Sequence, residues 1–156
     1  MRRLLPLLLL ALACGEDVPQ AAALEVGTGS WRFEALEDGQ EVELIRGAQG
    51  GWHVWVSFRV RGVDMDPVPV TLSMQPADEG REPYVTDVAL RFDPEDREGW
   101  RKTVGWTGIL PDPACVVGEL LRIEASLAMP DGELLRSERD VLVRGGTYPP
   151  GPCEEE

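Results

Sequence analysis

The chain is poor in the residues that most enzyme chemistry uses. Its 156 residues include a single histidine, His53, and three cysteines. Any nucleophile–histidine–acid triad would have to use His53. The nearest hydroxyl in sequence, Ser57, lies about 13 Å away if the segment is a strand rising roughly 3.3 Å per residue. No Gly-x-Ser-x-Gly segment occurs. We therefore expect no enzymatic activity, although the 28 acidic residues leave a glycosidase pair of carboxylates open.

Positive charge is also scarce. Lysine and arginine total 15 against 28 aspartates and glutamates, and the formal net charge is −13. Such a field repels phosphate backbones, which excludes nucleic acid as a partner. Acidic residues gather at 64–66 and 93–96, but neither stretch matches a calcium-binding EF-hand loop, and solvated turns explain them better. One histidine and two spare thiols make a poor zinc site. We expect no cofactor or metal.

No apolar run is long enough to cross a bilayer. The longest, residues 4–13, follows Arg2 and Arg3. Ten helical residues reach about 15 Å, half of a hydrocarbon core of about 30 Å. A positively charged start followed by a short apolar run is typical of a signal peptide.

The end of this run adds a second signal. Residues 10–14, Leu-Ala-Leu-Ala-Cys, resemble the lipobox of bacterial prolipoproteins, although Ala11 stands where that family usually has leucine. In the family the cysteine receives diacylglycerol and a peptidase cuts just before it. The resemblance implies that residues 1–13 are a cleaved signal peptide and that Cys14 carries a lipid anchor, which holds firmly with two or more acyl chains. An ordinary secretory cut beside an unmodified cysteine is the alternative.

The resemblance also predicts a compartment. Gly15 follows the cysteine, where lipoproteins kept in the inner membrane often have aspartate, so we expect a cell-envelope protein with the outer membrane favoured. In an oxidising space Cys115 and Cys153 would form a disulfide, with two free thiols as the alternative. The disulfide would tie the proline-rich acidic tail, residues 145–156, back onto the preceding domain.

Between the expected lipidated tether, 14–23, and this tail, residues 24–144 repeatedly alternate apolar and polar side chains. The strongest alternation runs from residue 52 to residue 61, followed in clarity by 121–129 and 135–143. The strongest strand turns one apolar face inward: Trp52, Val54, Val56, Phe58 and Val60.

Weaker alternation and turn signals complete the expected fold. An Asp-Gly pair at 38–39 predicts a hairpin between strands at 31–35 and 42–44. The only plausible helical turn spans 93–100. Further strands are expected at 68–74, 88–92 and 100–106. About eight short strands with glycine- and proline-rich turns predict an all-β, immunoglobulin-like antiparallel β-sandwich of seven to nine strands.

The most unusual stretch precedes the strongest strand. Its pattern, Gln-Gly-Gly-x-His, resembles a segment of uncharacterised predicted bacterial lipoproteins, a group for which no activity is known. Two glycines before a strand permit positive φ or a close backbone approach. An aromatic ring, an imidazole and a guanidinium would then share the more polar face of the strand. The candidate binding patch comprises Gln49, Gly50, Gly51, His53, Trp55 and Arg59. The alternative is a glycine hairpin beside an ordinary solvent-facing strand surface.

The five tryptophans divide by the faces on which they fall. Trp31 and Trp52 lie on apolar faces and are expected in the core, whereas Trp55, Trp100 and Trp106 are the ones that could be exposed as a carbohydrate platform. The sequence thus favours a membrane-anchored, non-enzymatic module that binds an envelope protein or serves a structural role. The alternative is a small-ligand or glycan binder that uses His53, Trp55 and Arg59 of the candidate patch.

Overall fold

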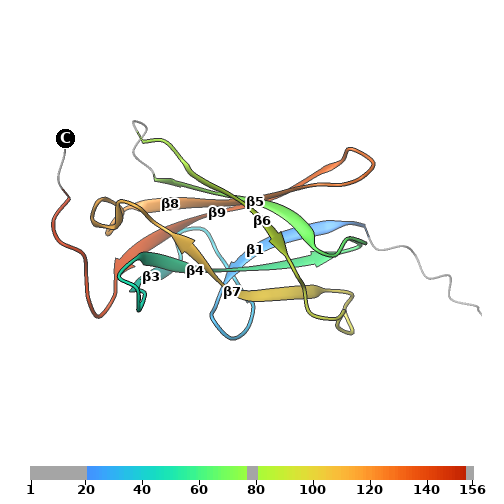
Figure 1. The fold of residues 1–156 in the computed structure, drawn as a ribbon, viewed down its shortest axis with the longest axis horizontal. Coiled ribbons are helices and arrows are strands. Elements are labelled where there is room, and N and C mark those ends of the chain that lie inside the picture. The colour runs from blue at the N-terminus through green and yellow to red at the C-terminus, as the bar shows by residue number, and fades with distance from the viewer. Residues whose placement is uncertain (1–20, 77–80, 154–156) are drawn as a thin grey trace, which may run out of the picture.

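The computed structural model describes residues 21–76 and 81–153 (Figure 1). The predicted signal peptide 1–13, the lipidation site Cys14 and most of the tether 14–23 lie outside the described residues. Within the described residues no helix is long and apolar enough to cross a membrane. The elements are β1 Ala23–Thr28, β2 Glu34–Ala35, β3 Glu41–Arg46, β4 Trp52–Arg61, β5 Val68–Pro76, β6 Tyr84–Leu90, β7 Arg101–Ile109, the 3₁₀ turn η1 Pro113–Cys115, β8 Leu120–Ala128 and β9 Leu134–Gly145.

The nine strands form a curled, mostly antiparallel sheet folded into two layers (Figure 1). One layer contains β2, β1, β4 and β7, and the other contains β9, β8, β5 and β6. Strand β3 joins them, because Ile45 and Arg46 pair with β4 while residues 41–44 run parallel to β9. The pairing of β4 with β7, and the position of β8 between β5 and β9, match strands B and E and strands C, F and G of immunoglobulin domains. The predicted sandwich is confirmed.

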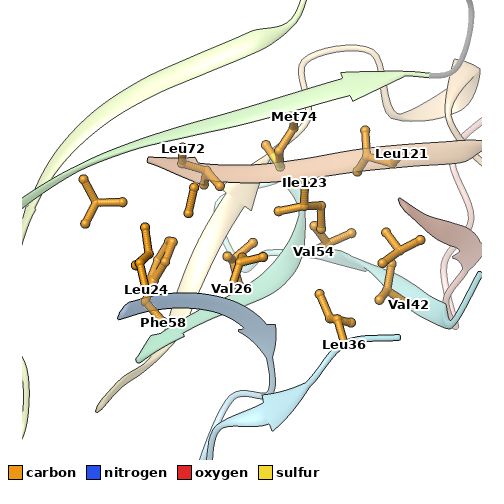
Figure 2. Close-up of a cluster of buried hydrophobic side chains, with 14 of the residues drawn as sticks. Leu24, Val26, Leu36, Val42, Val54, Phe58, Leu72, Met74, Leu121 and Ile123 are labelled. Carbon is orange, nitrogen blue, oxygen red and sulfur yellow. The ribbon is translucent and has the colours of Figure 1, made fainter. Parts of the chain in front are cut away.

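The core lies between the layers and follows the predicted period of two. Val54, Val56, Phe58 and Val60 of β4 are all fully buried. In Figure 2 the β4 side chains face Leu72 and Met74 of β5 and Leu121 and Ile123 of β8, with Leu24 and Val26 of β1 beside them. Trp52, expected in the core, is only half-buried and packs against the edge of this cluster.

The predicted hairpin between 31–35 and 42–44 is wrong. The turn itself is present, since the Gln40 N–H donates to the Glu37 carbonyl at 3.1 Å and Gly39 has a φ of +79°. However, β2 pairs with β1 and β3 pairs with β4 and β9, so this turn carries the chain from one layer to the other. The backbone at Gly39 donates to the Asp140 carbonyl of β9 instead of closing a two-stranded ladder. The Asp-Gly pair forms the turn that its residues favour, but long-range pairing gives the flanking strands different partners.

The expected helical turn at 93–100 is a loop without α-helix. The Asp96 carboxylate organises it by accepting hydrogen bonds from the N–H groups of Glu98 and Trp100 and from the Lys102 ammonium. These bonds, with Lys102 contributing most, lower the pKa of Asp96 to about 2. The loop turns Trp100 inward, which is why that residue is buried although the sequence left it free to be exposed.

Cys115 and Cys153 lie at disulfide-bonding distance, with their Cα atoms 4.6 Å apart. Cys115 ends η1, and Cys153 lies in the tail beyond β9. Arg81 donates to the Cys115 carbonyl oxygen at 3.1 Å. The described part of the predicted tail, residues 145–153, therefore returns to the body of the domain as expected, while residues 154–156 lie outside the described residues.

Candidate functional site

The predicted binding patch is divided by the structure. Gln49, Gly50 and Gly51 form the exposed turn between β3 and β4, where the Gly47 N–H donates to the Gly51 carbonyl at 2.7 Å. His53 is buried behind this turn. Trp55 is half-buried farther along β4. The six residues do not meet in one site.

His53 is held as a neutral, packed side chain. It is 8% exposed, and its buried Nε2 atom has no hydrogen-bond partner within the described residues. Its ring meets the edge of Trp55 at a centroid distance of 4.7 Å. Burial lowers the pKa of His53, because desolvation penalises the imidazolium. This arrangement suits packing better than acid–base chemistry.

The neutral state of His53 predicts an acid-sensitive stability. An unfolded histidine has a pKa of about 6.5, so below that pH the unfolded chain binds a proton that the folded chain resists. The free energy of unfolding should be level above about pH 7 and should decline as the pH falls from about 6.5 towards the lowered folded pKa. Urea titrations from pH 7.5 to 5 would measure it. The His53→Gln variant should lose this slope, and an unchanged slope would contradict the assignment.

The outer face of β4 is crossed by the loop of residues 29–33. The Ser57 hydroxyl donates to the Gly29 carbonyl at 2.8 Å, and the Gly105 N–H of β7 donates to the same oxygen at 3.1 Å. Ser57 is thereby fully buried and occupied, which removes it as a nucleophile. The loop separates Trp55 on one side from Arg59 on the other.

Trp31 stands at the crest of this loop and is 92% exposed, which corrects its predicted place in the core. The residues around it are fixed. Phe33 lies under the Arg59 guanidinium, whose centre is 4.8 Å from the ring centroid, and Gly29 is held by the two bonds described above. The indole of Trp31 is therefore presented to solvent by a braced backbone rather than by a loose loop.

One cleft opens between the loop and β3. Its volume is about 670 Å³, and Trp31 and Trp55 line it together with Glu34, Glu41 and Glu43. The remaining lining residues are Thr28, Gly29, Ser30, Arg32, Gln40, Val42 and Ile45. The Thr28 hydroxyl donates to the Trp55 carbonyl at 2.8 Å, which ties the end of β1, just before the loop, to β4.

Two of the three carboxylates in this cleft are neutralised. Arg32 pairs with Glu34 at 2.9 Å and Arg144 pairs with Glu41 at 2.7 Å. The hydrogen bond from Arg144 lowers the pKa of Glu41. Glu43 also borders the cleft and has no ion-pair partner among the residues that the structure describes; its carboxylate lies beside Gly146, just after β9, and adds an uncompensated negative charge next to the cleft.

A smaller hollow of about 300 Å³ lies on the other side of the loop, lined by Trp31, Arg32, Phe33, Arg59, Asp93, Lys102 and Val104. Its cations are already engaged. Arg59 donates to Glu25 at 2.8 Å and stacks on Trp100 at 4.3 Å, and Lys102 pairs with Asp96 at 2.5 Å. Arg59 therefore belongs to a packed ion-pair and aromatic cluster and not to a binding patch with Trp55.

The sequence matches no protein-family model, and no curated protein is significantly similar to it. The site must therefore be judged by its own geometry.

Sequence reasoning found Trp55 but missed Trp31 as a site residue. Gly29, two residues before Trp31, was the signal for a loop rather than a strand.

Proposed function

We propose that this protein is a lipid-anchored component of the bacterial cell envelope whose β-sandwich is a non-enzymatic module for binding another protein. The site would be the cleft of Trp31 and Trp55. The observation that carries the proposal is Trp31, 92% exposed on a loop that is hydrogen-bonded across the sheet. Tryptophan is enriched among residues that dominate binding energy, and rigid presentation reduces the entropy lost on binding. An exposed indole held in this way adds little to the stability of the isolated domain.

A small ligand or glycan is the second candidate. It is favoured by Trp55, which lines the cleft beside Trp31, and by a volume of about 670 Å³ that lies within the usual range for ligand sites. The sequence predicts such a binder on His53, Trp55 and Arg59 together. Only Trp55 of those three lines the cleft, so the structure supports this candidate through the two tryptophans.

Anchoring through Cys14 is supported by the resemblance to the lipobox. The Cys14→Ser variant should move from the membrane fraction to the soluble fraction after cell breakage, because acyl chains would supply the membrane affinity. Fractionation with immunoblotting measures this, and Cys14 lipidation is checked by intact mass. Membrane retention of Cys14→Ser at the level of the parent would show that lipid is not the tether.

Partner binding is tested by placing an aromatic photo-crosslinking amino acid, which keeps a large ring where the indole lies, at position 31 in living cells. We expect a discrete crosslinked envelope protein that disappears when Trp55→Ala is added. Tyr148, another exposed aromatic at 68%, provides the matched control position. Crosslinking of the same products from positions 31 and 148, or none from 31, would contradict the proposed site.

A further inference from the structure

The half of β3 that borders the cleft has a free edge. Residues 41–44 pair with β9 on one side. On the other side β4 pairs only with Ile45 and Arg46, and the described residues place no strand beside 41–44 there. The cleft occupies that side, since its walls come from β3 itself and from Thr28, Glu34 and Trp55 on the opposite layer. An unpaired strand edge can accept an extended chain as an added strand.

The charge and aromatic groups beside that edge indicate what such a chain carries. Glu43 has no ion-pair partner among the described residues, and the whole chain has a net charge of −13. Trp31 and Trp55 offer indole rings in the same cleft, and arginine and lysine are attracted to the faces of such rings. The hollow beyond Trp31 also contains a carboxylate, Asp93, but three cations line it as well, Arg32, Arg59 and Lys102, so it would not favour a cationic side chain.

We propose that the cleft binds an extended, arginine- or lysine-bearing segment of a partner protein, which adds along the free edge of residues 41–44 and places a cationic side chain against the two tryptophans, within the attraction of the uncompensated charge of Glu43. This deepens the proposed function and rests on it. Main-chain bonds to the edge would provide affinity for any extended chain, and the acidic aromatic wall would select the cationic one.

The test uses the mature lipidated protein in a non-ionic detergent and three probes. The first is an eight-residue peptide of alternating arginine and valine, the second has glutamate in place of arginine, and the third is a neutral chitin tetrasaccharide. Calorimetry measures affinity, and amide hydrogen exchange reports whether residues 41–44 become protected. We expect the arginine peptide to bind with slowed exchange at 41–44 and the other two probes not to bind.

Matched variants separate the cleft from general attraction to an acidic protein. Trp31→Ala should weaken binding of the arginine peptide roughly tenfold, and Glu43→Gln should weaken it about threefold. Tyr148→Ala removes another exposed aromatic, and Glu95→Gln removes the same charge from the exposed loop at 93–100. Neither control should change affinity.

Equal affinity for the arginine and glutamate peptides, unchanged exchange at 41–44, or equal effects of Glu43→Gln and Glu95→Gln would each overturn the inference. So would binding of the tetrasaccharide alone, which would assign the tryptophans to a glycan. In all of these cases a specific crosslink from position 31 would leave the proposed partner-binding function standing, whereas loss of that crosslink would remove the proposed function itself.

Discussion

Replacing Gly105 with alanine should lower the free energy of unfolding by about 2–4 kcal/mol. Gly105 lies in β7 with a φ of +73°, a conformation that alanine adopts only with strain. A β-carbon there would also lie 2.9 Å from the Ser30 carbonyl oxygen, so the loop of residues 29–33 would have to move away from the sheet. Urea unfolding followed by far-ultraviolet circular dichroism measures the loss.

Gly39→Ala is the matched control. Gly39 has nearly the same φ, +79°, but nothing lies within 4 Å of the position of its β-carbon. It should cost only about 1–2 kcal/mol, the conformational penalty alone. The difference between the two variants isolates the contact with the loop. Equal losses would show that Gly105 does not support the loop. The Gly105→Ala protein should also crosslink less from position 31, because Trp31 is carried by the displaced backbone.

Reduction of the pair Cys115 and Cys153 should lower the free energy of unfolding by about 3–4 kcal/mol on the chain-entropy model. The two residues are separated by 38 positions, and the segment between them contains all of β8 and β9. Crosslinking them restricts the unfolded chain far more than the folded one, in which both strands already have fixed places. Urea unfolding with and without reductant measures the difference.

The control for this effect is the double variant Cys115→Ser with Cys153→Ser. It should unfold at the urea concentration of the reduced parent and should not respond to reductant. Intact mass of the parent should increase by two hydrogens on reduction. An unchanged mass together with unchanged stability would mean that the two thiols are free in the mature protein.

The elements that sequence reasoning placed well are those whose side chains alternate over many residues. Strand β4, whose residues Val54, Val56, Phe58 and Val60 are fully buried, and the hairpin of β8 and β9 were expected within a few residues of where they lie. An alternation of apolar and polar residues over nine or more positions favours a single strand register. Slipping the register by one residue would turn the whole apolar face towards water. Asp131 and Gly132 close that hairpin, and the Asp131 carboxylate accepts a hydrogen bond from the Glu133 N–H.

The candidate site was harder to anticipate because it depends on segments distant in sequence. The sequence predicts Trp31 inside and leaves Trp100 free to be exposed, whereas the structure exposes Trp31 and buries Trp100. Trp100 is covered by the guanidiniums of Arg59 and Arg61, centred 4.3 Å and 4.8 Å from its ring. The residues next to Trp100 in the sequence do not specify these contacts, because the contacts require β4 and β7 to be neighbours.

The sequence by itself determined the class of this protein: an acidic, all-β domain with strong central strands and two cysteines suited to a disulfide, preceded by a segment resembling a lipoprotein leader. Those conclusions follow from composition, period and short patterns, which are local properties. The tertiary structure alone decided that β3 bridges the two layers, that Ser57 holds the crossing loop and that Trp31 faces a cleft with an unpaired strand edge. These depend on contacts between distant residues, and many pairings of the same strands satisfy the local pattern equally well.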